Sequence, residues 1–356
     1  ARFCRKGKAM RLTAGLRIVS HLRSLVGGRR LVGSLSCIGA TTKRRPPVVP
    51  FCFCRSILAV MLLPILGCKP ETSMDLSSFD GERAFQEVEA LVQFTPRDAG
   101  TPNGWKAAEH IFQRLESFGV ASEIDTFLDM TPDGEKTMRN VVGRIPGKTD
   151  QWIILGSHFD TMPGIDNFQG ANDSGSSTGV LLELARMLAA SRNVPDIGIV
   201  FAFFDGEEGI AGYVPGDGLH GSRHMALQLL QSGEHKKIKA MILLDMVGDK
   251  DLNFTIPYNS SRMLVQELLD AAHATGNRKY FSLSRSIITD DHVPFMEIGI
   301  PAIDLIDFKY GSEAGLNDHW HTASDNLENI SAASLEITGN TTIQLLSQLI
   351  SSEYAD

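Results

Sequence analysis

Four short, largely apolar runs are the most regular feature of the hydrophobic pattern, and polar or charged side chains stand at or just after the end of each. The runs span residues 152–156, 197–204, 240–248 and 301–307. They do not alternate between apolar and polar positions, so they predict strands buried on both faces of a sheet. Two further strands are expected at 123–129 and 139–145.

Helical spacing of apolar residues fills the intervals between these strands. Phe85, Val88, Leu91 and Val92 fall on one face of a helix. Further helices are expected at 104–118, 175–190, 218–231, 259–274 and 332–352. Strands that alternate with helices favour a largely parallel sheet with helices on both faces. The pattern therefore predicts a single globular α/β domain with a mixed, mostly parallel central sheet flanked by helices.

The charge is divided unevenly along the 356 residues. Residues 1–68 contain 13 of the 34 Lys and Arg residues and none of the 42 Asp and Glu residues. The rest of the chain is therefore strongly acidic, although the net charge of the whole is only -8. Nucleic acid is a poor candidate partner for such a body, because that binding depends on neutralising phosphates.

The N-terminal region has the layout of an export signal. Residues 55–68 read RSILAVMLLPILGC, with one positive charge, an apolar run and an ending that looks like a bacterial lipobox, so a lipid on Cys68 would anchor the protein to a membrane. A short membrane anchor is the alternative, but the run is shorter than the roughly 20 residues of a spanning helix. We expect an exported periplasmic or cell-envelope lipoprotein.

The expected organisation has four segments. Residues 1–50 form a basic extension that is non-native or disordered, 51–68 the lipoprotein-type signal segment, 69–82 a linker and 83–356 the globular domain, in which any catalytic site must lie. All cysteines precede the linker, at Cys4, Cys37, Cys52, Cys54 and Cys68. The body therefore has no thiol to act as nucleophile or ligand, and any metal there must be held by His and carboxylate groups.

Histidine and carboxylate side chains gather where the predicted strands end. In chain order they are His158, Asp160, Asp173, Glu207, Glu208 and Asp245. Ligand sites in open α/β sheets form outside the carboxyl ends of the strands, so we expect these side chains to converge. Such a set of N and O donors suits Zn²⁺ best.

A second histidine-rich stretch, DHWHTASDN, lies near the C-terminus. His319 and His321 flank Trp320, and in an extended segment the two imidazoles would point one way and the indole the other. The spacing leaves open which imidazole is a ligand.

Several of these motifs resemble the co-catalytic zinc aminopeptidases and the glutaminyl cyclases that share their fold. They are GSHFDT, GANDSGSSTG, FFDGEEG, LLDMVG and the WHT that begins at Trp320. Four other stretches are closer to the cyclases: EIDTFLDMTPDG, GLHGSRHMA, TDDHVPF and HWHTASDNLENI. The resemblance covers roughly residues 82–352 and implies a zinc aminopeptidase-like fold of the phosphorylase/hydrolase-like kind.

The resemblance also implies roles for the site residues. The zinc ligands would be Asp173, Glu208 and His321, and Glu207 would be the general acid/base. This leaves His319 as a bystander.

Further positions follow from the same resemblance. His158 and Asp245 match a second metal site of the dinuclear aminopeptidases, or hydrogen-bonded neighbours in cyclases with one zinc, and Asp160 would orient His158. Asp290 would be a catalytic residue near the substrate amine. Trp320 would form a wall of the substrate pocket, and Tyr213 stands where a second pocket tryptophan is expected.

The implied activity is a zinc-dependent glutaminyl-peptide cyclotransferase that converts an N-terminal glutamine to pyroglutamate and releases ammonia. Its substrate would be a peptide or protein N-terminus, with one zinc per chain favoured and two possible. The alternatives are a zinc aminopeptidase, in which Glu207 would deprotonate the attacking water, and a non-catalytic binding domain. The remaining histidines are expected in packing or surface roles, except His292, whose part in the site is left open.

Overall fold

The computed structural model describes residues 79–351, apart from residues 192, 213 and 215. The predicted basic extension, the signal segment with Cys68 and most of the linker lie outside this range, and so does Tyr213. Among the described residues, no helix has both the length and the apolar character needed to cross a bilayer.

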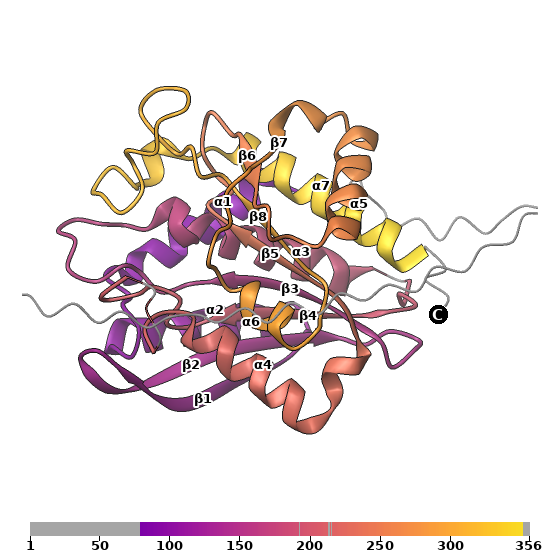
Figure 1. The fold of residues 1–356 in the computed structure, drawn as a ribbon, viewed down its shortest axis with the longest axis horizontal. Helices are drawn as coiled ribbons and strands as arrows, with labels where there is room; N and C mark the ends of the chain where they lie inside the picture. Colours follow the sequence, from indigo (N-terminus) through magenta and orange to yellow (C-terminus); the bar gives the residue numbers. More distant parts are fainter. Residues whose placement is uncertain (1–78, 192, 213, 215, 352–356) are drawn as a thin grey trace, which may run out of the picture. The chain divides into compact units, whose positions relative to one another are not determined.

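A six-stranded sheet forms the centre of this part of the chain, in the order β1-β2-β4-β3-β5-β8. The strands are β1 (Ala121–Thr131), β2 (Gly134–Ile145), β3 (Trp152–His158), β4 (Gly198–Phe204), β5 (Ile238–Asp245) and β8 (Ala302–Ile306). Strands β4, β3, β5 and β8 pair in parallel, while β1, β2 and β4 pair antiparallel. The predicted fold class is confirmed, with the parallel strands in the centre and a hairpin at one edge (Figure 1).

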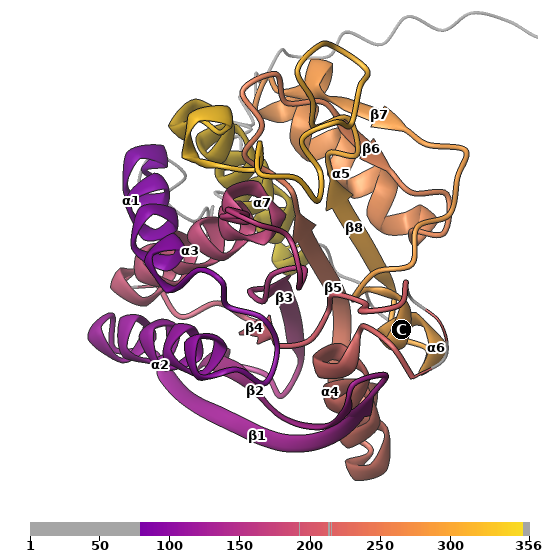
Figure 2. The same cartoon turned by 90° about the vertical axis from the view of Figure 1, so that its left-hand side faces the viewer.

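Helices cover both faces of the sheet (Figure 2). On one face lie α1 (Gly81–Leu91), α2 (Pro102–Ser117), α3 (Ser177–Ala190), α5 (Arg262–Ala274) and α7 (Ala332–Ser351). On the other lie α4 (His220–Ser232) and α6 (Val293–Glu297).

Strand β4 shows why the apolar runs form central strands. Its odd-numbered residues, such as Phe201 and Phe203, pack into the core beneath α1, α2 and α3. Its even-numbered residues, such as Ala202 and Phe204, pack into the second core against α4 and α6. Every residue of β4 is buried, as a strand with two covered faces requires.

Some short elements lack any signal in the hydrophobic pattern. Strands β6 (Phe254–Ile256) and β7 (Phe281–Leu283) form a small parallel sheet of their own, and neither these strands nor α6 was predicted. Elements of three to five residues are too short to establish a period.

The folded part also begins earlier than the predicted start at residue 83. Phe79 is buried, and the Asp80 side chain accepts hydrogen bonds from the first backbone N–H groups of α1. The last four residues of the expected linker therefore belong to the fold.

Candidate active site

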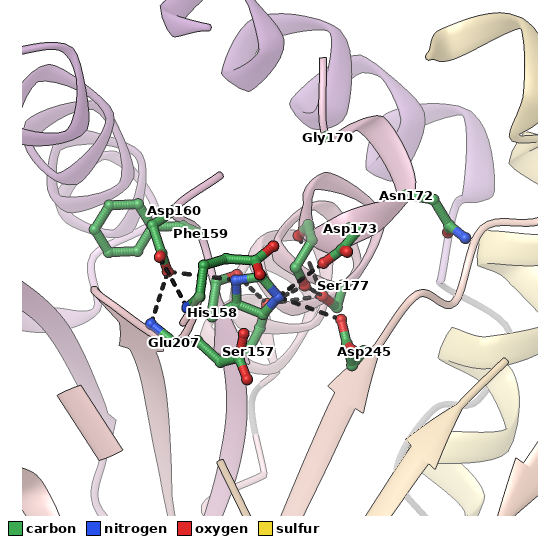
Figure 3. Close-up of polar contacts among 12 residues, drawn as sticks. Ser157, His158, Phe159, Asp160, Gly170, Asn172, Asp173, Ser177, Glu207 and Asp245 are labelled. Atoms are coloured by element: carbon green, nitrogen blue, oxygen red, sulfur yellow. Dashed lines mark hydrogen bonds and ion pairs between the residues drawn. The ribbon is translucent and has the colours of Figure 1, made fainter. Parts of the chain in front are cut away.

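The carboxyl end of β3 places His158 at the centre of a ring of carboxylates. Its Nδ1 atom lies 3.4 Å from Asp160, and its Nε2 atom lies 3.1 Å from Asp173 and 3.4 Å from Asp245 (Figure 3). The imidazole is 1% exposed. Residues from three separate segments thus meet here, at the sheet edge that the strand-end pattern predicted.

Asp160 also fixes the loop that follows β4. One carboxylate oxygen accepts the backbone N–H of Glu207 at 3.1 Å (Figure 3), and the other accepts that of Glu208 at 3.2 Å. The two glutamates are held at the rim by their backbones, and both are buried. Asp160 therefore contacts more than the histidine that it was predicted to orient.

Asp173 lies in the kinked segment Ala171–Ser176 just before α3, where its own backbone is not helical, with a φ of -104° and a ψ of 91°. One of its oxygens faces His158, and the other lies 3.3 Å from Nε2 of His321. The same His321 nitrogen lies 3.1 Å from Glu208. Asp173 is thus shared between two sets of residues that could hold a metal.

The first set consists of Asp173, Glu208 and His321. The second set consists of His158, Asp173 and Asp245. Within each set the donor atoms lie within 4.8 Å of one another. In the first set, both oxygens of Glu208 and Nε2 of His321 are buried and lack hydrogen-bond partners among the described residues. In the second, Nε2 of His158 already hydrogen-bonds to Asp173. Two carboxylates and an imidazole with unused buried donor atoms fit a zinc ion, so the first set is the better candidate metal site.

The protonation of the site reflects burial and crowding. Burial raises the pKa of Glu208 to about 7, and the nearby charge of Asp173 acts in the same direction. Burial also raises the pKa of Glu207 well above its usual range, with Asp290 adding to the effect and His158 opposing it. Burial opposes the charged form of His321, but Asp173 and Glu208 raise the pKa of the imidazole to about 10. A cation would relieve this concentration of buried carboxylates.

The sequence comparisons agree with this geometry. Residues 140–346 match the family model described as Peptidase family M28, which is more than half of the chain. The chain belongs to peptidase family M28.

Within this family, the chain is similar to proteins described as glutaminyl cyclases and to zinc exopeptidases. The glutaminyl-peptide cyclotransferase of Bos taurus is 29% identical over 275 residues, which cover 67% of this chain and 74% of the relative. The crystal structure of an Acidobacteriales bacterium glutaminyl cyclase superposes with a TM-score of 0.72 and 38% identity, covering 77% of this chain and 96% of that one. A Zn-dependent exopeptidase from Parabacteroides distasonis reaches 0.68 and 29%, covering 76% and 99%.

In this member of family M28, the stretch DHWHT is a turn, so the alternation of an extended segment does not apply. His321 has a φ of 53°, and its ring stacks on that of Trp320, with centroids 4.1 Å apart. Trp320 also contacts Phe308, at 5.0 Å between ring centroids. His319 points elsewhere and packs edge-on against Tyr310. The structure thus brings Trp320 and His321 together beside Glu208 and separates His319 from them.

Asp290 is 3% exposed and lies in the loop before α6, close enough to Glu207 to influence its pKa. Of the other histidines, His220 is buried and pairs with Asp129 at 2.7 Å, a packing role. His110, expected to face solvent, is instead half-buried against Phe94. His110 is therefore on the side of α2 that faces the core.

Two residues that the sequence did not single out hold Asp173 in place. Asp325 accepts the backbone N–H groups of Asn172 at 2.7 Å and of Asp173 at 3.0 Å, as well as the Tyr310 hydroxyl. Arg97 is fully buried and donates to backbone oxygens of Phe159, Gln169 and Gly170, which joins the end of β3 to the turn that carries Asp173. Asp325 lies within the WHTASD motif, whereas Arg97 is in a polar loop with no signal of its function.

Proposed function

We propose that the protein is a zinc-dependent glutaminyl-peptide cyclotransferase that converts the N-terminal glutamine of peptides to pyroglutamate and releases ammonia. The observation that carries this proposal is the placement of Trp320, whose indole stacks on His321 at the edge of the first metal-ligand set. A flat aromatic wall beside the metal site suits a flat side-chain amide. The likeness to the glutaminyl-peptide cyclotransferases of Bos taurus and Drosophila melanogaster, at 29% and 28% identity, supports the same activity.

Asp173, Glu208 and His321 would hold one zinc ion per chain. When bound, zinc supplies Lewis acidity to a carbonyl oxygen, here the γ-carbonyl of the substrate glutamine. The remaining work falls to side chains of the protein.

Glu207 is placed to move protons. It is buried, close to Asp290 and His158, and its backbone is fixed by Asp160. We assign it the proton of the α-amine as the amine attacks the γ-carbonyl; the C–N bond to the amide nitrogen then breaks and a proton returns to the departing ammonia. Asp290 would hold the α-amine, and Trp320 would hold the glutamine side chain curled toward it.

A zinc aminopeptidase is the alternative that a specific observation favours. The second set, His158, Asp173 and Asp245, lies beside the first and shares Asp173 with it, as two adjacent metal ions would require. A non-catalytic binding domain is disfavoured, because such a module has no need for a complete ligand set together with Glu207.

The deciding assay offers the purified protein an N-terminal glutaminyl peptide and, separately, a leucyl chromogenic amide, with zinc counted in the same samples. We expect ammonia release from the first substrate with one zinc per chain. Hydrolysis of the amide with two zinc ions per chain would overturn the proposal. We expect Trp320→Ala to lower kcat/KM for the glutaminyl peptide by about tenfold to a hundredfold with unchanged zinc content, since orientation is lost. Unchanged kinetics in this variant would remove Trp320 from the pocket.

A further inference from the structure

Asp290 also belongs to a third cluster of titratable side chains. Asp290, His292 and Asp304 each have a donor or acceptor atom within 4.8 Å of the others, and all three are buried. Asp304 stands in the middle of β8, a strand whose every residue is buried. A carboxyl group in such a strand requires an explanation beyond folding.

The two carboxyl groups cannot both be ionised without a positive partner. Within the part of the chain that the structure describes, no hydrogen-bond donor reaches either oxygen of Asp304 or the Oδ2 atom of Asp290. Two solutions remain for the pair, a metal cation or a shared proton.

Asn259 distinguishes between these solutions. Its Oδ1 atom accepts the backbone N–H of Ile288 at 3.1 Å, and its Nδ2 atom donates to the Ile288 carbonyl at 2.8 Å, so the orientation of the amide is fixed. The same Nδ2 atom lies 2.9 Å from Nε2 of His292. An amide nitrogen can only donate, so Nε2 must accept, and the proton of the neutral imidazole is on Nδ1.

This tautomer disfavours a metal ion in the cluster. Burial lowers the pKa of His292 to about 4, so the ring is neutral. Its protonated Nδ1 lies on the side of Asp304, 4.0 Å from Oδ2, and a protonated nitrogen cannot be a ligand. The remaining two carboxylates are too few for a zinc site.

The shared proton has a preferred position within the pair. Asp290 accepts the backbone N–H of Asp291 at 2.5 Å, which stabilises its ionised form, whereas Asp304 has no such donor. Burial and the neighbouring carboxylates raise the pKa of both Asp290 and Asp304 well above the usual range, so the pair retains a proton, and the hydrogen bond that Asp290 alone accepts favours Asp304 as its carrier.

We propose that Asp304 is a positioning residue for Asp290: a neutral carboxylic acid whose O–H donates to Asp290, supported by the Asn259–His292 pair, in a cluster that takes a proton rather than a metal. Its effect on turnover rests on the proposed function, in which Asp290 holds the substrate amine. The arrangement would fix the orientation of Asp290, whose Oδ1 atom accepts the backbone N–H of Asp291 and whose Oδ2 atom would accept the proton of Asp304.

The test compares Asp304→Ala and Asp304→Asn in the full chain, with Asp270→Asn on the exposed side of α5 as the matched control. Asparagine has the shape of the neutral acid, with one donor and one acceptor. We expect Asp304→Ala to lower kcat for a glutaminyl peptide by about tenfold or more while KM and zinc content stay within about threefold, and Asp304→Asn to restore kcat to within about threefold of the wild type.

Three results would overturn the proposal. If Asp304→Asn is as impaired as Asp304→Ala, the acid must be ionised. If either variant loses one equivalent of bound zinc, the cluster is a metal site. If Asp304→Ala leaves kcat unchanged, Asp304 does not position Asp290.

A second measurement does not depend on turnover. Long-range ¹H–¹⁵N spectra of protein labelled on histidine, with the His292 signals assigned from a His292→Gln sample, report which ring nitrogen is protonated. We expect Nδ1–H in the wild type and Nε2–H in Asn259→Asp, whose carboxylate can only accept. Nε2–H in the wild type would refute the proposed Asn259–His292–Asp304 arrangement, even if the enzyme is active. If the wild type has no activity on the glutaminyl peptide, the proposed function fails, but the His292 tautomer still tests the arrangement of the cluster. If Asp304→Ala does not fold, the spectra and the kinetics of Asp304→Asn test the proposal in its place.

Discussion

At the scale of single residues, Asp160 shows how one carboxylate arranges several others. It accepts the backbone N–H groups of Glu207 and Glu208 and lies beside Nδ1 of His158. Fixing the backbone at both glutamates lets the two adjacent side chains take different tasks. Glu208 faces His321, while the pKa of Glu207 is raised mainly by burial, with His158 opposing the shift and Asp290 adding to it.

The division of labour between the glutamates predicts the behaviour of Glu207→Gln. We expect turnover of a glutaminyl peptide to fall by about a hundredfold to ten-thousandfold, because the amide cannot carry the proton, while zinc content stays at the wild-type level. Glu208→Gln is the control and should lose zinc. Loss of zinc in Glu207→Gln instead would show that the two roles are exchanged.

Asp249 gives a prediction about pH and stability. It is 3% exposed, and one of its oxygens has no partner among the described residues, so burial raises its pKa to about 6. The folded state therefore holds this proton more tightly than the unfolded state, and the carboxyl group costs stability as the pH rises from about 4 through 6.

We expect Asp249→Asn to raise the free energy of unfolding by about 1–3 kcal/mol at pH 8 and to change it little near pH 4. Denaturant unfolding at both pH values measures the difference, with the exposed Asp270→Asn as the control. Equal stabilisation at both pH values would contradict the assigned cause.

At the scale of elements, the strands that carry the site were predicted closely. β3 and β4 begin within one residue of their predicted starts, and β5 covers Ile238–Asp245 where the run 240–248 was expected. Apolar runs of five to nine residues that are bounded by polar turns are too short for a typical helix and favour buried strands. The turn at DHWHT was not predicted, because the φ of 53° at His321 depends on contacts that the local sequence does not specify.

The junction between α7 and the segment before α1 can be tested at Gly339. A Cβ atom there would lie 2.3 Å from the ring of Phe79, so the two segments pack together only because residue 339 has no side chain. We expect Gly339→Ala to lower the free energy of unfolding by about 1–3 kcal/mol through overpacking. The exposed Glu336→Ala should change it by less than about 0.5 kcal/mol.

A smaller side chain at residue 79 should relieve the clash. In the double variant Gly339→Ala with Phe79→Leu, we expect part of the loss to be recovered relative to the sum of the single changes. Strict additivity would indicate that Phe79 and Gly339 are not in contact.

At the scale of the whole molecule, the described part of the chain concentrates negative charge where the parallel strands end. Asp173, Glu207, Glu208, Asp245 and Asp290 are all buried there. Folding without a cation must bring these groups together against their mutual repulsion. Binding of a cation at the site should therefore stabilise the folded domain.

Zinc removal should expose this coupling. We expect chelation to lower the Tm and added zinc to restore it, with a gain of about 2.7 kcal/mol at a hundredfold excess of zinc over its Kd. Differential scanning calorimetry measures the shift, and Glu208→Gln should show a much smaller one. An identical Tm in chelator and in zinc would argue against a metal at Asp173, Glu208 and His321.

The sequence by itself determined the α/β class, the order of the principal elements and the rim on which the site forms. These features are local, because a continuous apolar run or a helical period is complete within one segment, and parallel strands carry their carboxyl ends to the same edge. Only the tertiary structure decided that Asp325 and Arg97 hold the turn of Asp173, that Trp320 stacks on His321, and that Asn259 sets the tautomer of His292. Those contacts join residues far apart in the chain, and no local pattern records which partner a buried polar group will find.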